Sequence, residues 1–369
     1  MLTGHATPEG TARFSQQLPD VAPDDFRPFE GLRVSSIGFG TYLGEADAAT
    51  DALYAEALEA AIDQGCNVID TAINYRCQRS ERVIGATLEA LVAARRVARE
   101  AVLLCTKGGY LAFDGSVPVD PARYVLDTIL APGLATAEEL VGGWHCLAPA
   151  YLDRMLAASH ANLRAQTIDV YYLHNPEEQL NVVDRETVRQ RIRAAFEWLE
   201  HQVASRALRW YGVATWNGFR VHPTAKAFLS LEELVGLAET VAGSSHHCRV
   251  IQLPHNLAMP EAFAFKNQMV RGERLTLLEA AARLGVCVIG SASLLQQRLA
   301  SLAPSWDARI PGLSTAAQRA VQFARSTPGI TTALVGMKTR GHVEENFAVA
   351  RHPCLPEAAI RRLFERPPP

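Results

Sequence analysis

The segment IDVYYLHNP, at residues 168–176, begins with a short apolar run that ends in a histidine, His174. The run is continuous rather than alternating, which is typical of a parallel strand covered on both faces by helices. Similar runs rich in Val, Ile and Leu recur along the chain. We predict eight strands in all, at residues 36–40, 67–70, 102–107, 170–174, 209–214, 249–253, 287–291 and 333–336.

Stretches with helical periodicity separate the predicted strands. In residues 191–201, for example, apolar side chains recur at helical spacing with charged residues between them. We predict helices at residues 51–64, 79–99, 149–163, 186–204, 231–241, 275–284, 316–325 and 341–351. Eight consecutive strand–helix units with right-handed crossovers close naturally into an α/β fold, the (β/α)8 TIM barrel. A doubly wound sheet with an extra domain is the alternative, but it would need a linker near the middle, which the sequence lacks.

The predicted organisation is a single barrel domain over residues 31–355, with an N-terminal extension at 1–30 and a C-terminal tail at 356–369. The Pro-rich ends of the chain, Pro367–Pro369 among them, are expected to be frayed. A long insertion follows the third strand at residues 108–146, far longer than a usual loop between a strand and a helix. We expect part of residues 110–144 to line the substrate pocket, with Trp144 or His145 as candidate contacts. The alternative is that the insertion lies outside the barrel or mediates an oligomer contact.

The composition excludes several classes of protein. Lys plus Arg number 36 against 39 acidic residues, so no basic field exists to attract nucleic acid. No apolar run approaches the ~20 residues that a membrane span needs, and no signal peptide is evident. The seven cysteines are scattered and lack a CxxC pair, which favours reduced thiols in a cytoplasmic protein and no metal site. The GxSxG pattern of serine hydrolases and the HExxH pattern of zinc proteases are both missing from the sequence.

Three successive predicted strands end in ionisable side chains, namely Asp70, Lys107 and His174. Each has a simple structural explanation alone: a turn residue, a lysine that reaches solvent, a structural histidine. Together they favour a functional site, because the carboxyl ends of all barrel strands face one pocket. A lysine at the end of a buried strand also needs a partner to stay charged, and Asp70 is the candidate. Tyr75 follows Asp70 closely in the segment DTAINY, residues 70–75.

A glycine-containing segment, GFGTYLG at residues 38–44, follows the first predicted strand. Its third glycine comes one residue late for the GxGxxG pattern, and the acidic residue expected about 20 positions later would be Asp63, inside a helix, or Asp70. A turn at the mouth of a barrel explains the glycines better than a Rossmann loop. Gly40 and Thr41 in this turn are candidate cofactor-binding residues.

The order DTAxxY, then a strand ending in Thr106-Lys107, then IDVYYLH resembles the aldo-keto reductases. The resemblance extends from about residue 34 to about residue 350, nearly the whole chain. It implies an NADPH-dependent oxidoreductase that reduces an aldehyde, ketone or sugar carbonyl to an alcohol, with the reverse oxidation left open. It implies no particular substrate, and a homo-oligomer also stays open.

The resemblance also implies a catalytic tetrad of Asp70, Tyr75, Lys107 and His174. Tyr75 would supply a proton to the carbonyl oxygen, and Lys107 would lower the pKa of the phenol from about 10 towards working pH. Asp70 would hold the lysine charged and in place. His174 would donate a hydrogen bond to the substrate oxygen and stabilise the developing negative charge.

Cofactor contacts follow from the same resemblance. Gln252 would grip the nicotinamide carboxamide, Gly336 would approach a phosphate, and Lys338 would pair with the 2′-phosphate of NADPH. Glu345 and Asn346 would bind the adenine. The remaining candidate cofactor residues stand where this sequence departs from the family pattern or beside such a place: Thr215, Trp216, Ser291 and His342.

Those departures change the expected packing of the nicotinamide. Ala214-Thr215 replaces a common Ser-Asn pair, so Thr215 must substitute for a lost contact. Ser291 replaces an aromatic residue that stacks on the ring, a role that Trp216 could take over. The alternative function is a cofactor-sensing binding protein on the same barrel, like the family's potassium-channel β subunits. The intact tetrad favours the enzyme.

Overall fold

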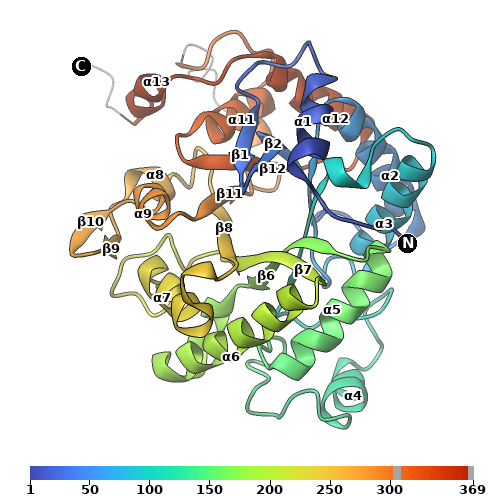
Figure 1. The fold of residues 1–369 in the computed structure, drawn as a ribbon, viewed down its shortest axis with the longest axis vertical. Coiled ribbons are helices and arrows are strands. Elements are labelled where there is room, and N and C mark those ends of the chain that lie inside the picture. The colour runs from blue at the N-terminus through green and yellow to red at the C-terminus, as the bar shows by residue number, and fades with distance from the viewer. Residues whose placement is uncertain (302–308, 365–369) are drawn as a thin grey trace.

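The computed structural model describes residues 1–301 and 309–364. Eight parallel strands form a closed barrel in the order β11-β12-β3-β4-β5-β6-β7-β8, with helices around it (Figure 1). The predicted TIM barrel is therefore confirmed, and each predicted strand has a counterpart whose ends differ by three residues or fewer. The strands are β3 (Ile37–Gly40), β4 (Val68–Asp70), β5 (Leu103–Gly108), β6 (Ile168–His174), β7 (Leu208–Ala214), β8 (Cys248–Pro254), β11 (Cys287–Ser291) and β12 (Ile330–Gly336).

A helix follows each barrel strand along the chain. Several of these helices begin at a side-chain cap, as where Asp184 accepts a hydrogen bond from the main-chain N–H of Thr187 at 2.9 Å. The helix predicted at residues 79–99 is too long, because Arg95 adopts a left-handed φ of 58° and the helix ends at Ala93. The helices are α2 (Ala48–Asp63), α3 (Arg79–Ala93), α5 (Pro149–Leu163), α6 (Arg185–Ala204), α7 (Leu231–Ala242), α9 (Leu277–Leu284), α11 (Ala316–Ser326) and α12 (Arg340–Phe347).

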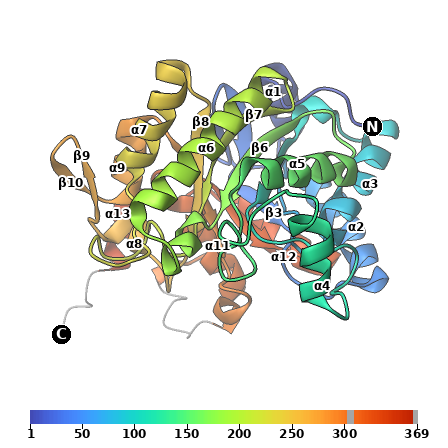
Figure 2. The same cartoon turned by 90° about the horizontal axis from the view of Figure 1, so that it is seen from below.

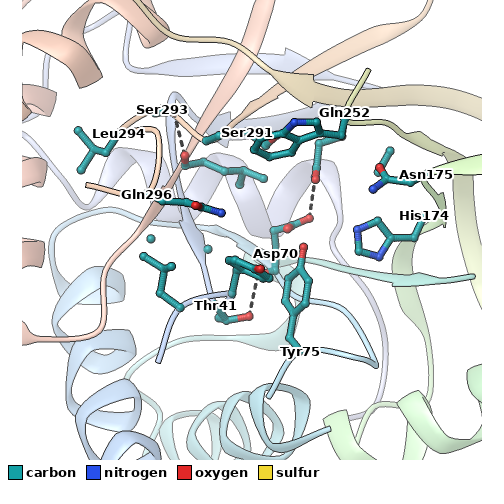
Figure 3. Close-up of a pocket in the computed structure, with 18 of the residues that line it drawn as sticks. Thr41, Asp70, Tyr75, His174, Asn175, Gln252, Ser291, Ser293, Leu294 and Gln296 are labelled. Atoms are coloured by element: carbon teal, nitrogen blue, oxygen red, sulfur yellow. Dashed lines mark hydrogen bonds between the residues drawn. The ribbon is translucent and has the colours of Figure 1, made fainter. Parts of the chain in front are cut away.

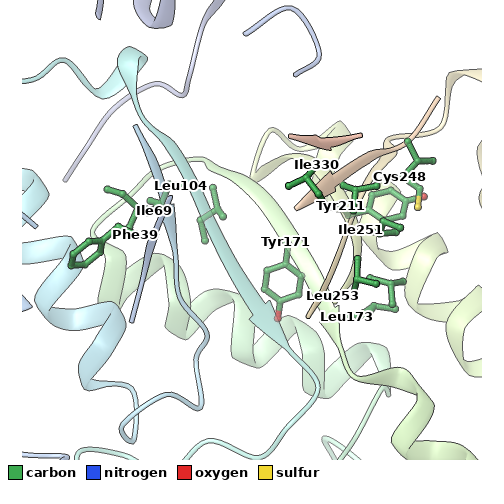
Figure 4. Close-up of a cluster of buried hydrophobic side chains, with 14 of the residues drawn as sticks. Phe39, Ile69, Leu104, Tyr171, Leu173, Tyr211, Cys248, Ile251, Leu253 and Ile330 are labelled. Atoms are coloured by element: carbon green, nitrogen blue, oxygen red, sulfur yellow. The ribbon is translucent and has the colours of Figure 1, made fainter. Parts of the chain in front are cut away.

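Side chains alternate between the two faces of the barrel wall. On β6, Val170 and Tyr172 belong to the cluster inside the barrel, whereas Tyr171 and Leu173 belong to the cluster between strands and helices. Figure 4 shows part of the outer cluster, which includes Tyr171 and residues of other strands. Both faces are therefore apolar, which explains the continuous runs in the sequence.

The N-terminal extension closes one end of the barrel instead of fraying. An antiparallel hairpin, β1 (Phe26–Phe29) and β2 (Leu32–Ser35), packs the buried Phe29 edge-on against Trp210 at 5.2 Å. The two residues between the strands, Glu30 and Gly31, both have positive φ, as a tight hairpin turn requires. The boundary expected at residue 30 falls inside this hairpin.

The first residues of the chain are also anchored. The N–H of Ala6 donates to Asp169 Oδ1 at 2.8 Å, and Leu2 forms a bridge with Ala165. A short helix, α1 (Pro8–Gln16), follows. The expectation of a frayed N-terminus is therefore wrong, because these apolar and main-chain groups are buried against the barrel. Pro367–Pro369 lie outside the described residues.

The insertion lies at the other end of the barrel. It carries α4 (Pro121–Val125) and a π-helical turn (Leu126–Leu130), and Figure 2 shows α4 and α1 at opposite ends. Among residues 1–301 and 309–364, no helix is both long and apolar enough to cross a membrane. Further elements that the sequence did not suggest are α8 (Glu261–Ala264), β9 (Gln268–Val270), β10 (Glu273–Leu275) and α13 (Glu357–Arg362).

Candidate active site

A cavity of about 520 Å³ opens at the carboxyl ends of the barrel strands (Figure 3). It collects side chains from the ends of β3, β4, β6, β7, β8, β11 and β12, which lie far apart in the sequence. Many of the predicted site residues line it: Gly40, Thr41, Asp70, Tyr75, His174, Thr215, Trp216, Gln252, Ser291 and Gly336.

Lys107 lies beneath this cavity in an ion pair with Asp70. The side chains of Lys107 and Asp70 are 1% and 6% exposed, so the pair is shielded from water. Lys107 Nζ also donates to the carbonyl oxygen of Thr71 at 2.8 Å, and Gln252 Nε2 donates to Asp70 Oδ2 at 2.8 Å. Burial acts to lower the pKa of Lys107, but Asp70 and Tyr75 raise it above its ordinary value. The ammonium group therefore stays charged.

Tyr75 stands over this lysine. Lys107 Nζ lies 5.1 Å from the centre of the Tyr75 ring. Burial raises the pKa of Tyr75, and the nearby Lys107 lowers it by less. The net change is opposite to the predicted lowering, because the recessed phenol loses more from desolvation of its anion than it gains from the lysine. Tyr75 is thus a protonated phenol at neutral pH, which is the form that can give a proton.

His174 faces Tyr75 across the cavity. The two ring centres are 5.8 Å apart, with the rings inclined by 75°. Burial lowers the pKa of His174 well below its ordinary value, and Lys107 and His145 add to this effect. The imidazole is therefore neutral and keeps one N–H. Within the described chain its Nδ1 is buried without a hydrogen-bond partner.

Tyr110 brings the insertion into the cavity wall. Its ring centre lies 4.9 Å from that of His174, and the rings are perpendicular at 89°. The Tyr110 hydroxyl accepts a hydrogen bond from Asn175 Nδ2 at 2.9 Å. The expectation that part of the insertion lines the pocket is confirmed at Tyr110. It is wrong for Trp144, which is 58% exposed, and His145 lies behind the wall rather than in it.

The loop after β7 is held by a residue that the sequence did not single out. Glu177, buried in the turn after β6, accepts hydrogen bonds at Oε1 from the main-chain N–H groups of Trp216, Asn217 and Gly218. These contacts measure 2.8, 2.9 and 3.3 Å respectively. They position Trp216 and Thr215 at the cavity. The sequence shows only an acidic residue just after Asn175-Pro176, and that pattern alone does not predict a role for Glu177.

The other predicted cofactor residues lie beyond the cavity, on or next to α12. Lys338 is half-buried beside the loop after β3, where a Cβ on Gly44 would be 3.8 Å from its Cδ. Asn346 is buried, and its Oδ1 has no hydrogen-bond partner in the described chain. Glu345 is half-buried and His342 exposed. The structure thus brings the tetrad together but leaves these four outside its cavity.

A model of the aldo/keto reductase family matches residues 36–303, most of the barrel. The chain belongs to the aldo/keto reductase family. Membership makes the protein an oxidoreductase that uses a nicotinamide cofactor. No relative with a curated description matches this sequence significantly.

Solved structures of other aldo/keto reductases share the fold at low identity. An aldo/keto reductase from Klebsiella pneumoniae, in complex with NADP and acetate, is 23% identical, with a TM-score of 0.61 over 92% of this chain and 94% of that one. The glycerol dehydrogenase of Gluconobacter oxydans is 17% identical, with a TM-score of 0.64 over 93% and 94%. The holo form of an aldo-keto reductase from Bacillus halodurans is also 17% identical, with a TM-score of 0.60 over 91% and 94%.

Other residues of this aldo/keto reductase line the cavity without having been predicted. Most are sequence neighbours of predicted residues, so their presence follows once the strand ends are placed. Three of them, Leu294, Gln296 and Gln297, come from the loop after β11, whose path is not readable from the sequence. The full set is Tyr42, Leu43, Asn74, Asn175, Ala214, Ala292, Ser293, Leu294, Gln296, Gln297 and Leu334.

Proposed function

We propose that this aldo/keto reductase uses NADPH to reduce the carbonyl group of a small aldehyde, ketone or sugar to an alcohol, reversibly. One observation carries the proposal. The rings of Tyr75 and His174 face each other with their centres 5.8 Å apart, above a buried Lys107–Asp70 ion pair. The complex of the Klebsiella pneumoniae relative with NADP supports the choice of cofactor.

The residues of the cavity would act as follows. NADPH supplies the hydride that adds to the carbonyl carbon. Tyr75 gives its phenolic proton to the carbonyl oxygen, so its O–H bond breaks as the alcohol O–H bond forms. Lys107 lies next to the phenolate that results and stabilises it, and Asp70 keeps the lysine in place. The N–H of His174 donates to the same oxygen while negative charge develops there.

The cavity residues fit a nicotinamide ring and its amide. Thr215 Oγ1 is buried without a partner among the residues described, as a donor or acceptor reserved for a ligand would be. The amide nitrogen of Gln252 donates to Asp70, and its carbonyl oxygen is then the atom that would accept from the carboxamide. Ser291 cannot stack on the ring, whereas Trp216 lines the same cavity and is half-buried. We therefore assign the packing role to Trp216.

A turnover assay tests the proposal against its alternative. The purified protein should oxidise NADPH, followed by the loss of the absorbance of its reduced nicotinamide, when it is supplied with aldehydes, ketones and sugars in turn. A cofactor-sensing binding protein would bind NADPH, as shown by quenching of tryptophan fluorescence, without turnover of any of these compounds. That result would replace the enzymatic proposal.

Replacing Lys338 by alanine should shift the choice of cofactor. We expect NADPH binding to weaken about 10- to 100-fold, because a charge-assisted hydrogen bond to the 2′-phosphate is lost. NADH lacks that phosphate, so its Kd should change less than about twofold. Fluorescence titrations with both cofactors measure this, with Lys226→Ala, an exposed lysine elsewhere, as the control. Equal losses for both cofactors would remove Lys338 from this role.

Replacing Glu177 by alanine should loosen the loop that carries Thr215 and Trp216. Three main-chain N–H groups would lose their shared acceptor, and we expect the Kd for NADPH to rise about tenfold. Glu177→Gln keeps an acceptor oxygen at the same place and should stay within about threefold of wild type. The titration described above measures both variants. An alanine variant with unchanged affinity would show that the loop holds its position without Glu177.

A further inference from the structure

The insertion ends at a buried histidine that contacts the main chain of His174. The side chain of His145 has no exposed surface, and its Nε2 lies 2.8 Å from the carbonyl oxygen of His174. Its Nδ1 lies 2.8 Å from Gln179 Nε2. Burial lowers the pKa of His145 to about 4, so the ring is neutral at physiological pH.

These contacts determine which ring nitrogen carries the proton. A carbonyl oxygen only accepts, so Nε2 of His145 must donate, and Nδ1 must then accept from the amide of Gln179. Gln179 Oε1 accepts in turn from Arg191 Nη1, and Arg191 Nη2 donates to the carbonyl oxygen of Glu138 at 2.9 Å. In this run of hydrogen bonds, Arg191 donates to Gln179, Gln179 donates to His145, and His145 donates to His174. The hydrogen-bond network therefore connects α6, the insertion and the end of β6.

The carbonyl group of His174 needs this donor. On the side of β5 the ladder stops where Gly108 pairs with Leu173, one residue before His174. A buried carbonyl without a partner costs free energy, so the donor from His145 replaces the missing strand contact. On the other side, Asn175 is tied to β7, where its N–H donates to Ala214 at 2.6 Å.

The rings of Tyr110, His145 and His174 also pack closely against one another. The Tyr110 ring lies 5.1 Å from His145 and 4.9 Å from His174, perpendicular to both at 90° and 89°. A Cβ on Gly109 would come within 2.9 Å of the His174 carbonyl oxygen and 3.1 Å of His145 Nε2. Only glycine fits there, which lets the insertion pass against the end of β6.

We propose that His145 is a positioning residue, which holds the main chain of His174 so that its imidazole meets the substrate oxygen beside Tyr75. The role rests on the proposed carbonyl reduction, and it gives the insertion a function in catalysis besides that of a pocket wall. Gln179 and Arg191 orient His145 from behind.

Two substitutions of His145 distinguish a positioning role, which needs its hydrogen bond to His174, from a role in which its side chain only fills space. The amide nitrogen of His145→Gln can reach the place of Nε2 and donate to His174. The amide of His145→Asn is one carbon shorter and reaches only the place of Nδ1. We expect His145→Asn to lower kcat about 10- to 100-fold, as small misplacements of reacting groups do. His145→Gln should stay within about threefold of wild type, and Kd for NADPH should hold in both.

Trp144→Ala, at the exposed neighbouring position, is the matched control and should behave as wild type. The 15N chemical shifts of the His174 ring give a readout that needs no turnover. They should differ from wild type in His145→Asn and match wild type in His145→Gln. Equal losses of kcat and melting temperature in the two variants would reduce His145 to a structural residue and overturn the proposal. So would unchanged kcat and ring signals in His145→Asn. Wild type without turnover, but with the expected ring signals, would overturn only the carbonyl reduction.

Discussion

Tyr75→Phe should lower kcat for carbonyl reduction by about 10²- to 10⁴-fold, the usual contribution of a positioned acid. The phenol is the only acidic group that the structure places over Lys107 and beside His174 at the cavity, within the described residues. Phenylalanine keeps the ring and its packing against Tyr42 and His174, and only the hydroxyl group, which carries the proton, is lost. The fold and the affinity for NADPH should therefore remain.

Tyr42→Phe supplies the matched control for this substitution. Tyr42 lines the same cavity, and its ring lies edge-on to Tyr75 at 5.1 Å, but it is 55% exposed. Its variant should keep turnover within about threefold of wild type, as substitutions on exposed surfaces usually do. Steady-state rates, a cofactor titration and a melting curve complete the comparison. A folded Tyr75→Phe protein with near-normal turnover would take Tyr75 out of the mechanism.

Lys107→Met should strongly reduce turnover and also destabilise the protein. The substitution leaves the Asp70 carboxylate buried without its cation, which costs about 3–5 kcal/mol when a buried ion pair loses one partner. The phenolate of Tyr75 would lose its neighbouring charge as well, so kcat should fall by about 10²-fold or more. Urea unfolding and steady-state rates measure the two losses separately.

The double variant Asp70→Asn/Lys107→Met tests the origin of the instability. It removes both charges, while the new amide oxygen can still accept from Gln252. We expect most of the free energy of unfolding to return, because replacing a whole buried pair is often nearly neutral, but turnover should stay lost. If the single variant is as stable as wild type, the carboxylate is solvated or protonated and the pair is not a structural element. If the double variant turns over normally, the pair has no catalytic role.

Some of the site was predictable because its residues stand at strand ends. A run such as residues 168–174 predicts a strand by its composition, and the barrel topology then brings its last residue to the common pocket. Asp70, Lys107 and His174 could be grouped in this way without knowing any contact. Glu177 could not, because it acts through a loop whose path depends on packing. For Tyr110 the sequence predicted only that some part of residues 110–144 lines the pocket. Glu177 reaches main-chain N–H groups about 40 positions later, which no local pattern records.

The sequence by itself determined the barrel, its eight strands and the family, because these depend on periodicity and on motifs within short stretches. Only the tertiary structure decided the direction in which the pKa of Tyr75 shifts, because burial outweighs the effect of Lys107. It alone showed the hairpin that closes the barrel and the chain from Arg191 through His145 to His174. The reason is physical. Desolvation, ring packing and hydrogen bonds between distant segments depend on which groups come within a few ångströms of each other, and that is set only when the whole chain is folded.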